Sequence, residues 1–167
     1  YKEPDGKDCY WSRGNGWVLA ALVRVMNELP ESHRYYKMCL KDFKAMCRAL
    51  KAVQRDDGFW NVSLHDPTHF GGKETTGTSL FIYGMAWGIR KGYLNEREYL
   101  PAVACAWNAL VGEAVHPNGF LGYVQGTGKE PASAQPVTFN RQPDFEDYGL
   151  GCFLLGATEY YRLLARR

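Results

Sequence analysis

Apolar residues recur every three to four positions along most of this chain, which is the spacing of a helix with one buried face. Glycine, proline and polar turns separate five such segments. The predicted helices span residues 15–27, 31–54, 76–91, 96–113 and 146–164, and residues 118–141 lack helical periodicity. The pattern therefore predicts an all-α protein whose helical succession is interrupted by one long loop.

The predicted helices are of two kinds. Those at 15–27, 76–91 and 146–164 open with small residues, whereas those at 31–54 and 96–113 carry a charged face. A helix with small or apolar residues all round is usually buried, and a helix with one charged face usually lies outside. We therefore expect inner and outer helices to alternate along the chain.

The helical units repeat along the sequence. Gly16 and Gly77, which open two inner helices, are 61 positions apart. Gly58 and Gly119 are also 61 positions apart, and each lies in a turn with an aromatic residue that follows an outer helix. The next interval, from Gly77 to Gly151, is 74 because it contains the long loop. Such a repeat of αα-hairpins predicts an α/α toroid. Two and a half hairpins are too few to close its ring.

Composition limits the classes of function. The chain has 167 residues, 46% hydrophobic and 23% charged, with a net charge of +2, which suits one globular domain. This charge is too small to favour a nucleic-acid partner. No apolar run is long enough for a membrane span, so no membrane partner is expected.

Cysteine and histidine spacing does not predict a metal site. The five cysteines form no CxxC pair, and neither a zinc site nor a disulfide framework is indicated. Free cysteines favour the cytoplasm over the periplasm. His65 and His69 are four apart, but Pro67 lies between them and predicts a loop. We expect no cofactor and no metal.

The segment from Tyr10 to Trp17, with the sequence YWSRGNGW, carries the strongest chemical signal. Trp11 offers a flat face for a sugar ring, and Arg13 offers a fork of donors suited to a carboxylate. The adjoining helix N-terminus adds attraction for an anion. Gly14 and Asn15 complete the turn. The segment predicts a site for an acidic sugar, although plain packing of a glycine-rich turn remains an alternative.

Parallel inner helices would bring their N-termini to one mouth. The residues expected to line a pocket there are Trp11, Arg13, Gly14, Asn15, Glu74, Thr75, Thr78, Asp147 and Tyr148. For Glu74, a plain helix-capping role is favoured over a catalytic one because carboxylates are stabilised at helix N-termini. In the long loop, Tyr123, Gln125, Thr127 and Phe139 either contact substrate or belong to an exposed hairpin without a direct role.

Three motifs together carry a family resemblance: YWSRGNGW at 10–17, QRDDGFW at 54–60 and ETTGTS at 74–79. In this order and spacing they closely resemble the unsaturated uronyl hydrolases of glycoside hydrolase families 105 and 88. The similarity is greater to family 105, the unsaturated rhamnogalacturonyl hydrolases. It extends through residues 83–94 to the segment GLGCFLLG at 149–156, and so covers nearly the whole chain.

The resemblance implies an (α/α)6 barrel of about twice this length, with residues 1–167 as its C-terminal half. It also implies hydration of the C4=C5 double bond in the terminal unsaturated uronic acid of pectin lyase products. The partner would be such an oligosaccharide, with rhamnose next in line. By position, Trp11 would stack on or wall the unsaturated ring, Arg13 would contact the substrate, Asn15 would supply a polar contact, and Trp17 would pack in the core.

The resemblance places the catalytic aspartate on an earlier inner helix, before Tyr1. We therefore expect this chain alone to be inactive, and to pair with an N-terminal half or with itself. Two other interpretations remain. The pattern Gln54-x-x-x-Gly58-x-Trp60 also occurs in terpene cyclases with α/α barrels, and a helical interaction module would use its small-residue face to bind a partner.

Overall fold

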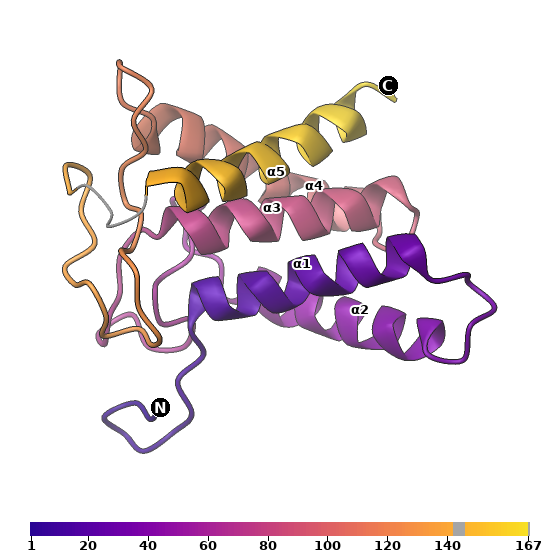
Figure 1. The fold of residues 1–167 in the computed structure, drawn as a ribbon, viewed down its shortest axis with the longest axis horizontal. Helices are drawn as coiled ribbons and strands as arrows, with labels where there is room; N and C mark the ends of the chain where they lie inside the picture. Colours follow the sequence, from indigo (N-terminus) through magenta and orange to yellow (C-terminus); the bar gives the residue numbers. More distant parts are fainter. Residues whose placement is uncertain (142–145, 167) are drawn as a thin grey trace.

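The computed structural model describes residues 1–141 and 146–166, without the side chains of residues 146 and 147, and it is helical as predicted (Figure 1). The helices are α1 (Ser12–Glu28), α2 (Tyr36–Ala52), α3 (Thr75–Arg90), α4 (Glu96–Ala109) and α5 (Glu146–Leu164). A short π-helix, η1 (Leu110–Ala114), continues α4. Within the described residues, extended backbone pairs only as isolated bridges.

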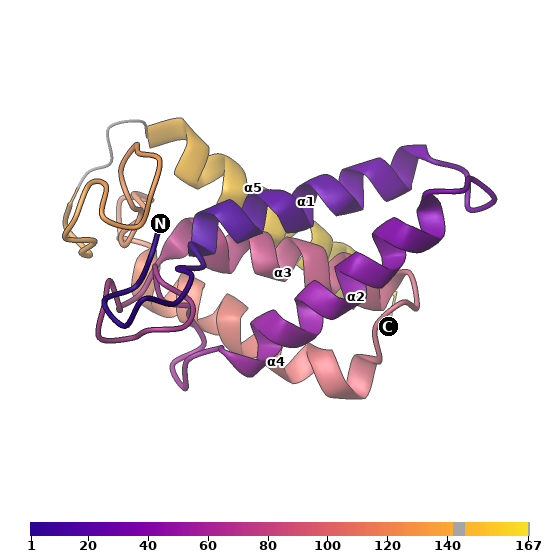
Figure 2. The same ribbon diagram turned by 90° about the horizontal axis from the view of Figure 1, so that it is seen from below.

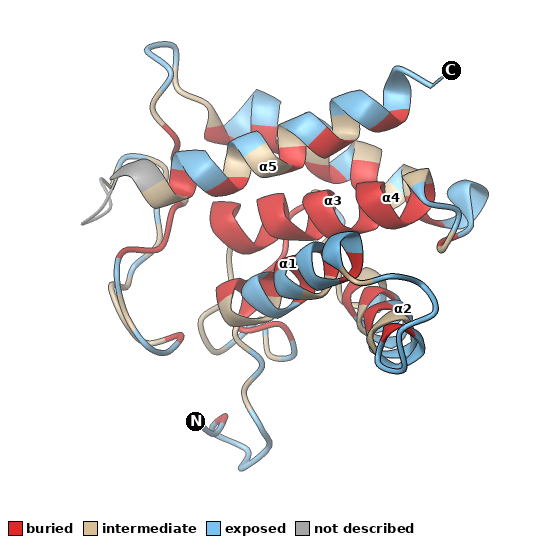
Figure 3. Ribbon diagram, turned by 45° about the vertical axis from the view of Figure 1, so that its right-hand side comes forward, coloured by how far each residue is buried: buried red, intermediate tan, exposed pale blue. Residues whose placement is uncertain are grey.

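The helices form an inner row and an outer layer. Helices α1, α3 and α5 run in the same direction, with α3 between the other two, while α2 and α4 run back and lie together on one side of the row (Figures 1 and 2). Every residue from Thr75 to Ile89 of α3 is buried, as the colouring of Figure 3 shows. The predicted alternation of inner and outer helices is confirmed.

Glycines let the inner helices approach closely. A Cβ atom on Gly77 of α3 would lie 3.0 Å from the carbonyl carbon of Ser12 in α1. A Cβ atom on Gly156 of α5 would lie 2.7 Å from the carbonyl oxygen of Ser79 in α3. Both separations are below a normal contact distance, so glycine is favoured over any residue with a side chain where α3 crosses its two neighbours.

The turn between α2 and α3 ties the outer layer to the inner row. Gln54 donates from Nε2 to the carbonyl oxygens of Gly58, at 2.9 Å, and Ala102, at 3.0 Å. The fully buried Trp60 donates from its indole nitrogen to the carbonyl oxygen of Leu50, at 2.8 Å, and its ring meets that of Phe81 edge-on. The Gln54-to-Trp60 motif therefore acts here as a structural link between helix ends.

The helix bounds differ in places from the prediction. Helix α1 starts three residues early, at Ser12, because the NH of Ser12 donates to the carbonyl oxygen of Val62 at the end of an extended segment. Helix α2 starts at Tyr36 and not at residue 31, because residues 31–35 form turns hydrogen-bonded to Pro30 and His33. Cys105, which the periodicity predicts as buried, is exposed.

The outer flanks of the inner row carry exposed apolar side chains. On α1 these are Trp17, Val18 and Val25, and on the described part of α5 they are Leu150, Leu154, Tyr161 and Leu164. Among the three inner helices, as far as the structure describes them, α3 alone is therefore covered on both sides. None of the helices described is long and apolar enough to span a membrane.

Candidate functional site

The N-termini of the three inner helices lie at the same end of the molecule (Figure 1). A cavity of about 370 Å³ opens there, and we call it the mouth cavity. Its lining comes from α1, from α5 and from the long loop between η1 and α5. The described lining residues are Trp11, Arg13, Trp17, Thr127, Gly128 and Tyr148. Sequence reasoning anticipated four of these positions, counting the loop residue Thr127.

Trp11 is held in place by the backbone on either side of it. The NH of Leu64 donates to the carbonyl oxygen of Tyr10, and the NH of Ser12 donates to the carbonyl oxygen of Val62, both at 2.9 Å. Trp11 thus pairs with the extended segment that follows the α2–α3 turn, opposite Ser63. Its indole nitrogen donates to Oε1 of Gln125 at 2.8 Å. The ring is therefore fixed at both its backbone and its polar edge.

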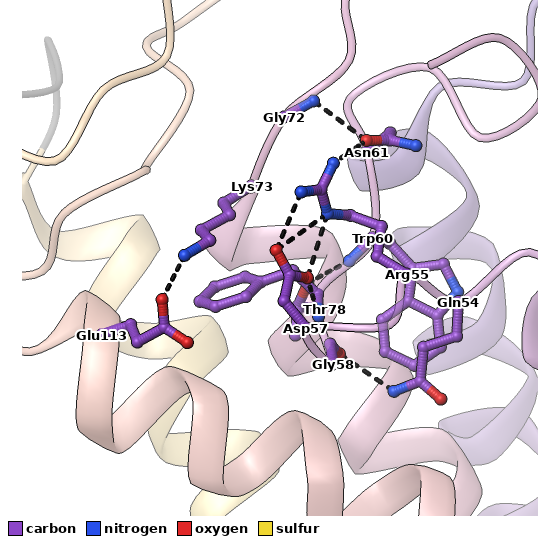
Figure 4. Close-up of polar contacts among 11 residues, drawn as sticks. Gln54, Arg55, Asp57, Gly58, Trp60, Asn61, Gly72, Lys73, Thr78 and Glu113 are labelled. Carbon is purple, nitrogen blue, oxygen red and sulfur yellow. Dashed lines mark hydrogen bonds and ion pairs between the residues drawn. The ribbon is translucent and has the colours of Figure 1, made fainter.

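The segment that supports Trp11 is braced by charged side chains (Figure 4). Arg55 donates to both carboxylate oxygens of Asp57 and, from Nη1, to Oδ1 of Asn61 at 2.6 Å. The same amide oxygen accepts from the NH of Gly72 at 2.9 Å. Burial tends to raise the pKa of Asp57, but hydrogen bonds from Arg55 and from the NH of Phe59 outweigh it and lower the pKa. The carboxylate form of Asp57 therefore stabilises this turn.

Arg13 lies between two aromatic rings and is only 4% exposed. Its guanidinium carbon is 4.8 Å from the Trp11 ring centroid and 5.2 Å from that of Tyr148. It donates to the carbonyl oxygens of Gln125, at 2.6 Å, and Gly126, at 2.9 Å, and to the Tyr148 hydroxyl, at 3.1 Å. Arg13 therefore holds the long loop against α1 and α5, and it also lines the mouth cavity.

Gly14 and Asn15 shape the start of α1. A Cβ atom on Gly14 would lie 3.2 Å from Cε3 of Trp11, so the glycine makes room for that ring. Asn15 donates from its amide to the carbonyl oxygen of Trp11 at 2.9 Å. Its described surroundings are a smaller cavity beside Tyr10 and not the mouth cavity. Both residues support Trp11, and a direct substrate contact by Asn15 stays a prediction.

The structure places Glu74, Thr75 and Thr78 in the interior, all at 0% exposure. Glu74 caps α3: its carboxylate accepts from the NH groups of Thr76, at 3.0 Å, and Gly77, at 2.6 Å. Thr75 donates to the carbonyl oxygen of Gly122, and Thr78 accepts from the NH of Trp60. These side chains are hydrogen-bonded inside the protein and have no surface to present to a pocket, because the helix terminus they secure is itself covered.

The predictions for Asp147 and Tyr148 of α5 and for Trp17 of α1 fare differently in the structure. Tyr148 lines the mouth cavity, whereas the side chain of Asp147 lies outside the described residues. The prediction that Trp17 packs in the core is wrong: the side chain is 46% exposed and lines the mouth cavity. Its place in the helical pattern is informative, because Trp17 falls off the buried stripe of α1 that runs through Leu19 and Val23.

The long loop is partly buried rather than a fully exposed hairpin. Gln125 has no exposed surface, and Thr127 reaches the mouth cavity. Phe139 stacks on His116, with ring centroids 3.6 Å apart, and Tyr123 packs edge-on against Phe59. Of the four loop residues that the sequence singles out, Tyr123 and Phe139 therefore pack at the base of the loop. Thr127 lines the mouth cavity, and Gln125 supports its wall through Trp11.

The electrostatics of the mouth cavity favour an anion. Arg13 is the one ionised side chain among its described lining residues, and no described carboxylate lies in the lining. A larger cavity, of about 650 Å³, lies beside residues 2–10. Its lysines are paired with its own aspartates, as in Lys2–Asp8 and Lys7–Asp5, and its walls come largely from one exposed arm. The mouth cavity is therefore the better candidate site.

Residues 1–164 match the sequence profile described as Glycosyl Hydrolase Family 88. An unsaturated 3S-rhamnoglycuronyl hydrolase from Formosa agariphila is 35% identical over 164 residues, which is 97% of this chain and 41% of that protein. The chain thus spans about two fifths of the length of this relative.

Solved structures show the same architecture. A family 88 glycosyl hydrolase from Bacteroides vulgatus superposes with a TM-score of 0.89 at 39% identity, covering 98% of this chain and 46% of the other. A family 105 glycoside hydrolase from C. acetobutylicum superposes with a TM-score of 0.75 at 26% identity, covering 97% of this chain and 49% of the other. In both, the matched part is just under half of the solved chain.

Proposed function

Because the chain belongs to glycosyl hydrolase family 88, we propose that it forms part of the substrate site of a hydrolase acting on oligosaccharides that end in an unsaturated uronic acid. The observation that carries the proposal is the convergence of Trp11, Arg13 and Trp17 on one cavity at the N-terminus of α1. An unsaturated uronic acid presents a flattened ring and a carboxylate, and these residue types suit both.

Each residue has a distinct role in this proposal. Trp11 and Trp17 provide apolar faces against which sugar rings stack. Arg13 attracts the uronate carboxylate. Because the Arg13 side chain is buried, salt in the solvent screens the attraction between its guanidinium and the carboxylate only weakly. The N-terminal end of α1 adds a favourable dipole. These groups bind and orient the substrate, but none of them donates the proton that the reaction needs.

The reaction itself needs a carboxylic acid beside the C4=C5 bond. Protonation of that vinyl ether, addition of water and opening of the resulting hemiketal would release the next sugar. We propose that the acid comes from outside this chain. Among the described side chains, Glu74 is the buried carboxylate at the N-terminus of an inner helix, and it is committed to capping α3. The name of the Formosa relative favours rhamnose as the released neighbour.

A helical interaction module is the second candidate. It is favoured by the exposed apolar side chains on the outer flanks of α1 and α5, which include Val18 and Leu154. Gel filtration with light scattering distinguishes the two at low cost. Self-association that fails to respond to any unsaturated oligosaccharide would favour the module over the hydrolase.

The test uses an unsaturated galacturonyl-rhamnose disaccharide, with the saturated disaccharide as control. This chain alone should quench its tryptophan fluorescence on binding but leave the enol-carboxylate ultraviolet absorbance intact. A chimera in which the remaining hairpins come from the Bacteroides vulgatus relative should remove that absorbance. A folded chimera that neither binds nor consumes the disaccharide refutes the proposal. Loss of absorbance with the chain alone would instead place the acid within it.

A further inference from the structure

The Gln125 side chain lies beside the mouth cavity, is hydrogen-bonded at both ends of its amide and is fully buried. Its Oε1 accepts from the Trp11 indole at 2.8 Å. Its Nε2 donates to the carbonyl oxygens of Ser133, Pro131 and Glu130, at 2.8, 3.1 and 3.4 Å. One side chain thus joins the aromatic wall of the cavity to the far limb of the long loop.

The main chain of the same residue reaches all three inner helices. Its carbonyl oxygen accepts from Arg13 of α1, at 2.6 Å, and from the Tyr148 hydroxyl of α5. Its NH makes a long hydrogen bond, 3.5 Å, to Glu74 at the start of α3. Gln125 therefore sits where the three helix N-termini meet.

The surrounding donors and acceptors fix the orientation of the Gln125 amide. The indole of Trp11 can only donate, and the three loop carbonyls can only accept. Reversing the amide would set its NH₂ against a donor and its oxygen against three carbonyl oxygens. Glutamine satisfies both sides at once, which glutamate, leucine and methionine cannot do.

From this geometry we infer that Gln125 is a positioning residue of the substrate site, which holds the Trp11 ring and the Thr127–Gly128 rim in fixed positions relative to each other. This inference rests on the proposed function for its catalytic consequence. All the described lining residues except Trp17 either hydrogen-bond to Gln125 or follow it within three positions in the loop it holds. Substrate binding then depends on a residue that has no surface in the cavity.

The first test measures the geometry directly and needs no substrate. The five tryptophans are labelled with 5-fluorotryptophan, and the Trp11 resonance is assigned by Trp11→Phe. Gln125→Leu should shift or broaden that fluorine resonance more than the resonances of the buried Trp60 and Trp87. Gln54→Leu is the matched control, since it removes a glutamine that also bridges two carbonyls but lies away from the mouth cavity.

The second test measures the consequence in the chimera described above. Gln125→Leu should raise KM about tenfold and change kcat by less than about threefold, because lost stacking geometry weakens binding before it affects proton transfer. Gln125→Glu separates the two contacts. It keeps an acceptor for Trp11 but turns oxygen toward the loop carbonyls, so it should retain the Trp11 resonance while still raising KM. If Gln125→Leu does not fold, the KM of Gln125→Glu still tests the positioning role.

The outcomes are distinguishable. An unmoved Trp11 resonance in Gln125→Leu, or an equal shift in Gln54→Leu, overturns the positioning role. An active wild-type chimera whose KM is unchanged by both Gln125 variants also overturns it and leaves the proposed function intact. If a folded wild-type chimera neither binds nor consumes the disaccharide, the proposed function fails, while the fluorine spectra still decide whether Gln125 positions Trp11.

Discussion

Two glycines five positions apart on α5 should respond oppositely to the same substitution. A Cβ atom on Gly156 would lie 2.7 Å from the carbonyl oxygen of Ser79, which belongs to the backbone of α3 and cannot rotate aside. A Cβ atom on Gly151 would meet nothing within 4 Å. The pair therefore separates the packing requirement at the α3–α5 crossing from the intrinsic helix preference.

The expected magnitudes follow from two opposing terms. Alanine in place of a mid-helix glycine gains about 0.5–1 kcal/mol because the unfolded chain loses less entropy on folding. Overpacking a close contact costs about 1–3 kcal/mol. Gly151→Ala should therefore stabilise by about 0.5–1 kcal/mol, and Gly156→Ala should destabilise by about 1–2 kcal/mol after the helix gain is subtracted.

Thermal unfolding followed by circular dichroism at 222 nm measures both variants. For a chain of this size, 1 kcal/mol shifts Tm by about 2–4 °C. Tm should then rise by about 1–4 °C for Gly151→Ala and fall by about 2–8 °C for Gly156→Ala, compared at one protein concentration. A Gly156→Ala variant as stable as the wild type would refute the claim that the helices approach too closely for a Cβ atom.

Three further predictions concern the cap, the turn and the mouth cavity. Glu74→Ala should lower the free energy of unfolding in urea by about 3–4 kcal/mol because buried donors lose their acceptor, and Glu74→Gln by about 1–2 kcal/mol; equal losses would contradict the capping role. Burial acts to raise the pKa of Asp57, but the hydrogen bonds from Arg55 outweigh it and lower that pKa. The stability that the ionised Asp57 side chain contributes is therefore present above about pH 4 and is lost as the pH falls further. Asp57→Asn should therefore flatten the acid limb of a stability–pH curve, and an unchanged limb would count against the Arg55 pairing. Trp17→Ala should cost less than about 1 kcal/mol yet abolish most quenching by the unsaturated disaccharide, whereas strong destabilisation would mean the ring is structural.

The helices could be predicted because their signals are local. Periodic apolar residues and small helix openings, such as Gly77, are visible within a short window, and the period of the repeat gives their arrangement. The predicted start of α2 at residue 31 is wrong because the side chains at 31–35 are compatible with a helix. Their turn depends on backbone hydrogen bonds to Pro30 and His33, which leave no pattern in the sequence.

The candidate site was only partly predictable, because its contacts join distant segments. Trp11 and Arg13 stand out as residue types beside a helix start. The partners of Arg13, however, are backbone carbonyls more than a hundred positions away, and backbone groups have no side-chain signature. Gln125 could be noticed in the long loop, but its orientation needed the fold. The prediction that Trp17 packs in the core is wrong because the sequence pattern of an aromatic ring near a helix start is shared by buried and exposed rings.

The central position of α3 has a consequence for how this chain loses its structure. Helical repeats often contact only their sequence neighbours and can then unfold piecewise. Here α3 contacts α1, α2, α4, η1 and α5, so every other helix borders on the same buried surface. Detaching any one of them exposes part of a helix that water does not otherwise reach. Cooperativity in this molecule therefore comes from a shared central helix, and backbone amides of α3 should be the last to exchange their hydrogens with solvent.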